Sequence, residues 1–248
     1  MGKCILYSDR QIGDYNMDSI KMQKKSLLDY KAVIFDLDGT LYYQKTFRKR
    51  MFVFLLKHML THPSGVKDIL LIKKYREYRE NWEKYEKTGL YSEGADLNRR
   101  QYEAVAKAKK VSPERVEKAV SFFMLEAPLK FLPKYRDEIL FELIIKLHRE
   151  DVKVVVYSDY PVKDKLNALG IKADEVFTSA DESIGCMKPD PRGIRVILEM
   201  LGLSADEAIM IGDRYEKDGL AAEKNKVDYI ILPSSKKERN KNDMLKLL

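Results

Sequence analysis

The sequence predicts an α/β protein with a parallel, Rossmann-like sheet flanked by helices. Five short runs rich in β-branched residues have the length of strands, and each ends in a polar or Gly-containing turn. These runs are Ala32–Phe35, Val152–Tyr157, Glu175–Ser179, Ala208–Gly212 and Tyr229–Leu232. Three of them contain continuously apolar stretches, which are typical of strands buried on both faces. Helix-length segments separate the later runs, so strand and helix alternate as in right-handed βαβ units.

The helices of this predicted sheet domain are marked by their ends. Three are expected over Val162–Leu169, Arg192–Leu201 and Lys217–Asn225. Gly170 and Gly202 follow the first two at the position where a left-handed residue commonly ends a helix. Arg136–Arg149 is amphipathic and leads directly into the second strand, so we expect it to be the crossover helix before that strand.

A long interval between the first and second strands has a helical pattern with almost no strand pattern. Its helical segments are Thr46–His62, Asp68–Glu86, Asn98–Lys110 and Pro113–Leu125. Because a structureless loop of this length is improbable in a compact domain, residues 44–131 are expected to form an inserted helical subdomain. Residues 31–43 and 132–233 then form the core. The polar residues 1–30 are expected to be an N-terminal extension, and residues 234–248 a mobile C-terminal tail.

Composition excludes several classes of protein. The 248 residues carry a formal charge of +7, and 45% are hydrophobic, which is enough to build a core. No apolar run approaches the roughly 18–20 residues that span a bilayer, and the N-terminus lacks the apolar stretch of a signal peptide. We therefore expect a cytoplasmic protein with no membrane partner. The two cysteines, Cys4 and Cys186, lie far apart and exclude a disulfide scaffold or a Cys-based zinc site.

Side chains that can carry chemistry follow the predicted strands. They are Asp36 and Asp38 after the first strand, Ser158 after the second, Lys188 in a proline-flanked loop, and Asp213 and Asp218 after the fourth. The carboxyl ends of parallel strands share one rim, where ligands bind in open α/β sheets. Carboxylates, waters and phosphate oxygens are the ligands that Mg²⁺ takes in proteins. A hydroxyl and exposed backbone N–H groups at the same rim could bind an oxyanion.

Each cluster alone also has a structural interpretation. Ser158 could cap the following helix, and Lys188 could be a solvated loop charge. Asp213 could be a helix N-cap, with Asp218 on the surface of that helix. An Asp-Gly-Thr turn is ordinary, but it leaves Asp36, at the end of an apolar strand, unexplained.

The order of these clusters resembles the haloacid dehalogenase-like hydrolase superfamily, in its members with a helical cap inserted after the first motif. The run Asp36-Leu37-Asp38-Gly39-Thr40-Leu41 is the most specific part, and the resemblance extends from Lys31 to Leu232. It implies that Asp36 is a nucleophile that forms an aspartyl-phosphate and that Asp38 is the general acid and base. It also implies that Ser158 binds the transferring phosphoryl group and that Lys188 offsets the negative charge crowded around the nucleophile.

The resemblance further implies a Mg²⁺ cofactor. Asp213, the Asp36 carboxylate and the Asp38 backbone carbonyl would hold the ion, and Asp218 would orient its waters or Lys188. Because Asp38 must be protonated during the reaction, its pKa is expected to be raised relative to that of Asp36.

The function implied is a Mg²⁺-dependent phosphatase acting on a small phosphorylated metabolite. The second acid, Asp38, argues against halide displacement, whereas phosphonate cleavage through a cap lysine stays open. A sugar-phosphate mutase is the closest alternative. A non-catalytic anion- or nucleic-acid-binding protein on the same fold is the alternative of another class. The sequence leaves the substrate and the oligomeric state open.

The predicted cap carries the basic excess of the chain. Residues 45–130 contain 20 Lys and Arg against 11 Asp and Glu, so a positive lid is expected to attract anionic substrate. An aromatic stripe of Tyr75, Tyr78, Trp82 and Tyr85 has the spacing of a buried helix face, which is favoured over a nucleic-acid surface. The three histidines, His58, His62 and His148, show no metal-ligand spacing.

Overall fold

Five parallel strands form one sheet in the computed structural model of the chain, which describes residues 25–63, 65–87, 89 and 96–239. The strands are β1 (Ala32–Phe35), β2 (Lys153–Ser158), β3 (Glu175–Thr178), β4 (Ala208–Gly212) and β5 (Asp228–Ile231). Their order in the sheet is β3-β2-β1-β4-β5, so β1 is central. Phe35, its last residue, pairs with Val156 of β2 and with Ile211 of β4. The α/β class and the five strands predicted from the sequence are confirmed, with bounds that shift by at most one residue.

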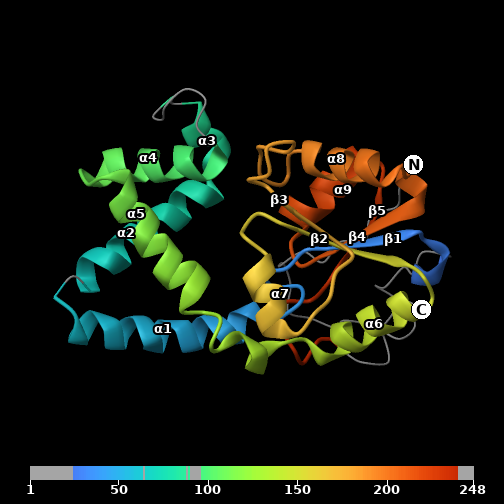
Figure 1. Ribbon diagram of the computed structural model, residues 1–248, viewed down its shortest axis with the longest axis horizontal. Coiled ribbons are helices and arrows are strands. Elements are labelled where there is room, and N and C mark those ends of the chain that lie inside the picture. Colours follow the sequence, from blue (N-terminus) through green and yellow to red (C-terminus); the bar gives the residue numbers. More distant parts are fainter. Residues whose placement is uncertain (1–24, 64, 88, 90–95, 240–248) are drawn as a thin grey trace, which may run out of the picture.

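Helices cover both faces of the sheet (Figure 1). On one face lie α6 (Glu138–Arg149) and α7 (Lys163–Leu169), whose apolar side chains join those of Val33, Phe35 and Val154. On the other face lie α8 (Arg192–Leu201) and α9 (Leu220–Lys224). Burial of each strand on both sides explains why the strands read as continuous apolar runs.

Two predicted helix ends agree with the backbone, whereas the helices predicted to begin at Arg136 and Lys217 begin at Glu138 and Leu220. Gly170 and Gly202 adopt left-handed conformations directly after α7 and α8, as expected for helix C-caps. Asp137 caps α6, because its Oδ1 accepts hydrogen bonds from the backbone N–H groups of Ile139 and Leu140. The crossover role predicted for this helix holds, since α6 runs from the rim of the sheet back to the start of β2.

The inserted segment is helical throughout its described part and forms a second body beside the sheet (Figure 1). Its helices are α1 (Gln44–Thr61), α2 (Gly65–Glu80), α3 (Trp82–Glu86), α4 (Leu97–Lys109) and α5 (Pro113–Val120), followed by a π-helical turn, η3 (Ser121–Glu126). The described residues also form short turns: η2 (Leu27–Asp29), η4 (Leu132–Tyr135), η5 (Ala205–Glu207) and the π-helical η6 (Tyr215–Gly219). We call the α1–α5 body with η3 the cap.

The cap has its own apolar core. Tyr75, Tyr78 and Trp82 are buried in it, and Tyr85 packs against it partly buried. The aromatic stripe is therefore a packing face, as its spacing indicated. The single helix predicted over Asp68–Glu86 is wrong in one respect. Asn81 leaves the helical conformation, with φ −114° and ψ 30°, and divides the segment into α2 and α3.

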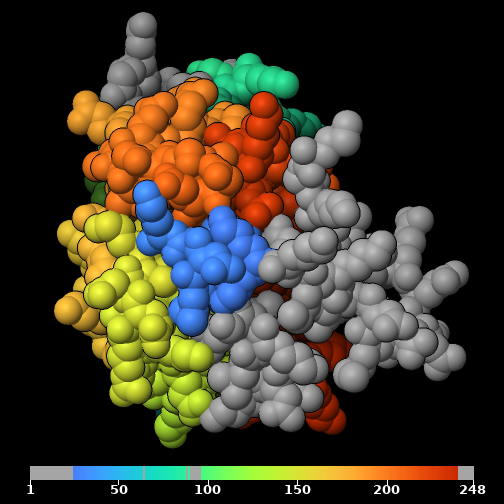
Figure 2. Space-filling model, turned by 90° about the vertical axis from the view of Figure 1, so that its right-hand side faces the viewer, coloured from blue at the N-terminus to red at the C-terminus, as the bar shows by residue number. Residues whose placement is uncertain are grey.

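Both ends of the described chain pack on the core. Residues 25–31 (blue in Figure 2) lie between α6 and the segment that contains η5 and α8, and Leu27 and Tyr30 are buried. Arg239 is only 4% exposed, although it falls in the segment from residue 234 that is predicted to be a mobile tail. The physical reason is a set of buried polar contacts that the sequence pattern does not show. Residues 1–24 of the predicted extension, with Cys4, and residues 240–248 of the tail lie outside the described residues.

None of the described helices combines the length and the apolar composition needed to cross a membrane.

Candidate active site

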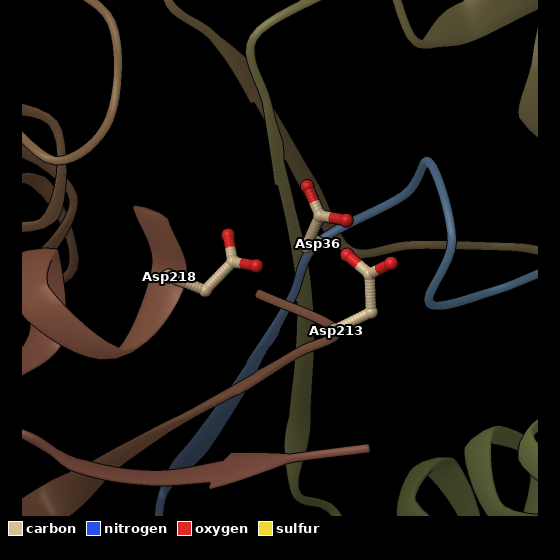
Figure 3. A group of neighbouring side chains, drawn as sticks. All are labelled: Asp36, Asp213 and Asp218. Atoms are coloured by element: carbon tan, nitrogen blue, oxygen red, sulfur yellow. The ribbon is translucent and has the colours of Figure 1, made fainter. Parts of the chain in front are cut away.

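Three carboxylates meet at the carboxyl rim of the sheet (Figure 3). Asp36 follows β1 directly, and its backbone N–H donates to the carbonyl of Ile211 in β4, which continues the ladder into the site. Asp213 follows β4, and Asp218 comes from η6. Each offers an oxygen, and these three atoms lie within 4.8 Å of one another. Parallel pairing thus brings together acids that are far apart in the sequence.

Two glycines allow this close packing. Gly39 has φ +109°, and a Cβ atom there would lie 2.1 Å from Oδ2 of Asp213. A Cβ atom on Gly212 would lie 2.4 Å from the side chain of Asp218. Any larger residue at either position would have to displace an acid of the site.

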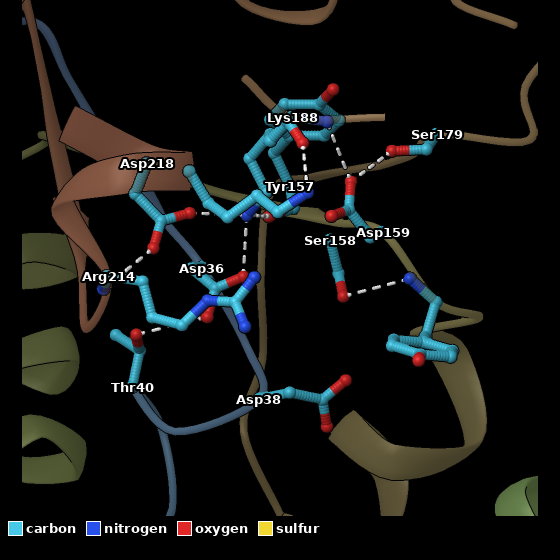
Figure 4. A network of polar contacts seen from close by, with 12 residues as sticks. Asp36, Asp38, Thr40, Tyr157, Ser158, Asp159, Ser179, Lys188, Arg214 and Asp218 are labelled. Atoms are coloured by element: carbon cyan, nitrogen blue, oxygen red, sulfur yellow. Dashed lines mark hydrogen bonds and ion pairs between the residues drawn. The ribbon is translucent and has the colours of Figure 1, made fainter. Parts of the chain in front are cut away.

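Lys188 lies between two of the acids (Figure 4). Its Nζ donates to Oδ1 of Asp36 and to Oδ1 of Asp218, at 2.6 Å in both cases. The lysine is 2% exposed, so it is no solvated loop charge. Its backbone N–H donates to Oδ1 of Asp159 at 3.1 Å, and the Ser179 hydroxyl donates to the same oxygen. Asp159 therefore holds the loop that carries Lys188.

Ser158 and Asp213 are not helix N-caps, and Asp218 is not on a helix surface, although the sequence allowed these positions. Ser158 is buried at the end of β2, and its Oγ accepts from the N–H of Tyr160, whereas the N-cap of α7 is Val162. Asp218 is 2% exposed rather than on a helix surface. The N-cap of η6 is Arg214, so Asp213 does not have that role.

Asp38 is paired with a lysine that the sequence analysis did not single out. Nζ of Lys165 in α7 lies 2.6 and 2.8 Å from the two carboxylate oxygens of Asp38, and the Tyr42 hydroxyl donates to Oδ1 at 2.5 Å. Burial alone would raise the pKa of Asp38, but Lys165 and Tyr42 outweigh it and lower that pKa.

The pKa order expected for the two motif acids, with Asp38 above Asp36, is therefore wrong. Burial raises the pKa of Asp36 well above its ordinary value, and the charges of Asp218 and Asp213 add to this against the opposing effect of Lys188. Burial, followed by the charge of Asp218, raises the pKa of Asp213 to about 7. Crowded carboxylates that resist ionisation in this way are typical of a site that gains a cation.

The donor set fits a hard divalent cation. Carboxylate oxygens from Asp36, Asp213 and Asp218 converge, and no Cys or His belongs to this group among the described residues. Mg²⁺ prefers such oxygen ligands and usually keeps several waters. Asp38, by contrast, directs its carboxylate to Lys165 and Tyr42, so only its backbone carbonyl is left as a ligand.

A cavity of about 580 Å³ lies between this rim and the cap. All six predicted site residues line it: Asp36, Asp38, Ser158, Lys188, Asp213 and Asp218. The cap contributes Arg48, Arg76 and Arg79, and the core adds Arg214 and Lys217. The cavity therefore joins an acidic floor to walls that carry several cations.

Arg79 is a second residue that the sequence analysis missed. It lies in α2, is 1% exposed, and donates to Gln101 Oε1 at 2.5 Å and to the Tyr75 hydroxyl at 3.0 Å. It also donates to the backbone carbonyl of Asp159 in the core. A buried guanidinium thus connects the cap to the loop after β2. One lysine or arginine among many in a charged sequence gives no signal of such a position.

Comparison with known proteins agrees with this fold. A sequence model of the haloacid dehalogenase-like hydrolase family matches residues 30–225. The chain belongs to this family of hydrolases, and the resemblance that the motifs indicated is confirmed.

The individual proteins that the chain resembles share only a small part of its sequence. Pyrophosphatase PpaX of Listeria innocua is 27% identical over 117 residues, which cover 43% of this chain and 51% of PpaX. The chain thus spans about half the length of the curated relatives it matches. The HAD-hydrolase YfnB of Bacillus subtilis, solved with magnesium bound, superposes with a TM-score of 0.53 at 16% identity, over 82% of this chain and 86% of YfnB. L-2-haloacid dehalogenase of Xanthobacter autotrophicus gives the same TM-score and identity, over 82% and 77%. These two structures show the shared fold of core and cap.

Proposed function

We propose that the protein is a Mg²⁺-dependent phosphatase that hydrolyses a small phosphorylated metabolite through an aspartyl-phosphate. The observation that carries the proposal is the position of Asp36. Its carboxylate lies on the floor of the cavity, 2.6 Å from Nζ of Lys188 and close to two further carboxylates. A carboxylate in this place can reach a phosphorus atom whose charge Lys188 and a divalent cation offset.

The first step forms one bond and breaks another. An Asp36 oxygen attacks phosphorus, and the bond from phosphorus to the ester oxygen breaks. Asp38 donates a proton to the leaving alkoxide. Asp38 is paired with Lys165, but an incoming dianionic phosphate favours its protonation, because a nearby negative charge raises the pKa of a carboxyl.

The second step reverses the protonation of Asp38. Its carboxylate takes a proton from water, the water oxygen attacks phosphorus, and the bond to Asp36 breaks, which releases inorganic phosphate. Ser158 lines the cavity beside Asp36 and would donate its hydroxyl hydrogen to a phosphoryl oxygen. Lys188 would neutralise the same group, while Asp218 and the carbonyl of Tyr157 hold its ammonium in place.

Asp36, Asp213 and the Asp38 carbonyl would hold Mg²⁺, with Asp218 beside them. When bound, the ion supplies positive charge that offsets repulsion between the nucleophile and the phosphate. Burial, with the added charge of neighbouring carboxylates, raises the pKa values of Asp36 and Asp213, and a bound cation would offset both effects, which supports this assignment. The magnesium bound in YfnB is further support.

The walls of the cavity support a small anionic substrate. Arg48 and Arg76 project from the cap into the lining, and Lys217 lines it from the core. Such cations raise the local concentration of phosphate esters. A pyrophosphatase among the sequence relatives agrees with phosphoryl chemistry.

Hydrolysis of p-nitrophenyl phosphate by the purified protein tests the proposal. We expect turnover with Mg²⁺, loss of turnover with chelator, and loss of at least about 10³-fold in Asp36→Asn. Asp164→Asn, an exposed acid on α7, is the matched control and should keep full activity. During turnover in oxygen-18 water the released inorganic phosphate should gain label while the Asp36 carboxylate should not, because water attacks phosphorus and not the carboxyl carbon. Activity that survives both chelation and Asp36→Asn would overturn the proposal. A need for a bisphosphate activator, with return of phosphate to a substrate hydroxyl, would indicate a mutase instead.

A further inference from the structure

Arg239 lies outside the residues that match the family, in a polar segment with no recognisable motif. Its guanidinium is nevertheless among the most enclosed charges of the described chain, with a side-chain exposure of 1%. A buried arginine needs partners for its donors, because an unpaired buried charge is very costly.

The partners of Arg239 are backbone carbonyls of the motif turn and one acid. Nη1 donates to the carbonyl of Thr40 at 2.7 Å and to Oδ2 of Asp137 at 2.8 Å. Nη2 donates to the carbonyl of Gly39, and Nε donates to the carbonyl of Pro233 at 2.6 Å. The planar guanidinium thus contacts two consecutive carbonyls directly after Asp38, which a lysine cannot do with the same geometry.

The turn that Arg239 contacts sets the spacing of the acidic site. Thr40 Oγ1 donates to Oδ2 of Asp36 at 3.1 Å. The Cα of Gly39 packs so closely on Asp213 that a Cβ atom would lie 2.1 Å from its carboxylate. A displacement of the Gly39–Thr40 backbone therefore moves Asp36 through the Thr40 hydrogen bond. It also changes the space available to the Asp213 carboxylate, which packs against Gly39.

Asp137, the acid that accepts from Arg239, is itself held in place by the backbone of the core. Asp137 is 1% exposed, and while its Oδ2 accepts from Arg239, its Oδ1 accepts from two backbone N–H groups at the start of α6. The Asp137 backbone N–H also donates to the carbonyl of Leu41 at 3.0 Å. Arg239 thus connects the motif turn to the N-terminus of a helix of the core.

We infer that Arg239 is a positioning residue of the active site, which holds the turn after Asp38 so that Asp36 and Asp213 keep the spacing that Mg²⁺ and phosphate require. The inference rests on the proposed function for its catalytic consequence. The effect of Arg239 on the turn and on Mg²⁺ binding is independent of turnover.

The test compares Arg239→Met and Arg239→Lys with Arg195→Met, an exposed arginine on α8. In Arg239→Met we expect kcat on p-nitrophenyl phosphate to fall about 10- to 100-fold with KM changed less than about threefold, because the reacting groups lose alignment while the cavity walls stay. Arg239→Lys should recover only part of kcat, and ethylguanidinium added to Arg239→Met should recover more than ethylammonium does. Arg195→Met should match the wild type.

Two readouts do not depend on turnover. Amide NMR shifts of Gly39, Thr40 and Asp36 should change in Arg239→Met, and Mg²⁺ affinity measured by calorimetry should fall about tenfold, as for loss of a group that orients metal ligands. A folded Arg239→Met protein with wild-type Mg²⁺ affinity and unchanged shifts at the turn would overturn the inference. An inactive wild-type protein would instead count against the proposed function, while the Mg²⁺ and NMR measurements would still decide the role of Arg239.

Discussion

Lys165 and Asp38 form a buried ion pair in which one ammonium contacts both oxygens of one carboxylate, at 2.6 and 2.8 Å. The lysine comes from α7, the helix after β2, and Asp38 lies in the turn after β1, so the pair connects the segments that follow these two strands. The Asp38 carboxylate is thereby held in one orientation.

Lys165→Met should destabilise the protein by about 3 to 5 kcal/mol at neutral pH, since it leaves a buried carboxylate without its cation. The Asp38 pKa is lowered in the folded protein, so this pair stabilises the fold above the unfolded pKa and loses its effect as pH falls through the folded pKa. In the variant the same carboxyl would protonate at higher pH, so the difference from wild type should shrink between about pH 7.5 and pH 5.5. Urea unfolding at both pH values measures this. Lys163→Met, an exposed lysine on the same helix, should cost less than about 0.5 kcal/mol.

Mg²⁺ affinity should depend on pH through Asp213. Its pKa of about 7 means that the carboxyl is largely protonated at pH 6 and largely ionised at pH 8. Because a ligand carboxyl must lose its proton to bind a metal, affinity should be about tenfold higher at pH 8 than at pH 6. Titration calorimetry at the two pH values checks the ratio. In Asp213→Asn the affinity should be weaker at both, and its pH dependence over this range should be much smaller. An unchanged ratio in that variant would place the titrating group elsewhere.

Gly212→Ala should impair the site without unfolding the core. The new methyl group would lie 2.4 Å from the Asp218 side chain, so Asp218 must move away from Nζ of Lys188. We expect kcat to fall by about 10- to 100-fold, as for a misplacement near 1 Å. Gly202→Ala is the matched control, since a Cβ there meets nothing within 4 Å. Its left-handed backbone should cost about 1 kcal/mol of stability and leave kcat unchanged. Equal activity of the two variants would contradict this account of Gly212.

The cations of the cavity wall should make turnover sensitive to salt. We expect kcat/KM for a phosphate ester to fall roughly three- to tenfold between about 20 and about 200 mM NaCl, because salt screens the attraction of an anion to the cap. Replacing Arg48 and Arg76 by glutamine together should flatten this dependence. Lys49 and Lys73 are exposed on the same two helices but do not line the cavity, so their double glutamine variant should keep the wild-type slope. An equal salt dependence of kcat/KM in both double variants would show that the net charge of the protein, and not the charge of the cavity wall, sets this dependence.

Much of the fold was predictable because the relevant signals are local. Buried parallel strands read as apolar runs, and the bounds of β1, β4 and α8 agree with the predicted ranges to the residue. The site was predictable because strand order places motif residues at a common rim. The assignment of roles to those residues, and of residues 44–131 as the cap, goes beyond the geometry and stays a prediction.

What sequence reasoning missed depends on long-range contacts between ordinary charged residues. Lys165, Arg79 and Arg239 each sit among many similar side chains, and only the folded chain places them beside Asp38, Asp159 and the motif turn. The pKa order of Asp36 and Asp38 was wrong for the same reason, since the partner of Asp38 was not visible.

The central place of β1 in the sheet has a consequence for biosynthesis. Ala32–Phe35 pairs on one side with a strand that starts at Lys153 and on the other with one that starts at Ala208. The nascent strand therefore leaves the ribosome well before either neighbour, while the intervening helices can already assemble through contacts close in sequence. Such an unpaired apolar strand is a point of vulnerability to aggregation until translation reaches its second neighbour.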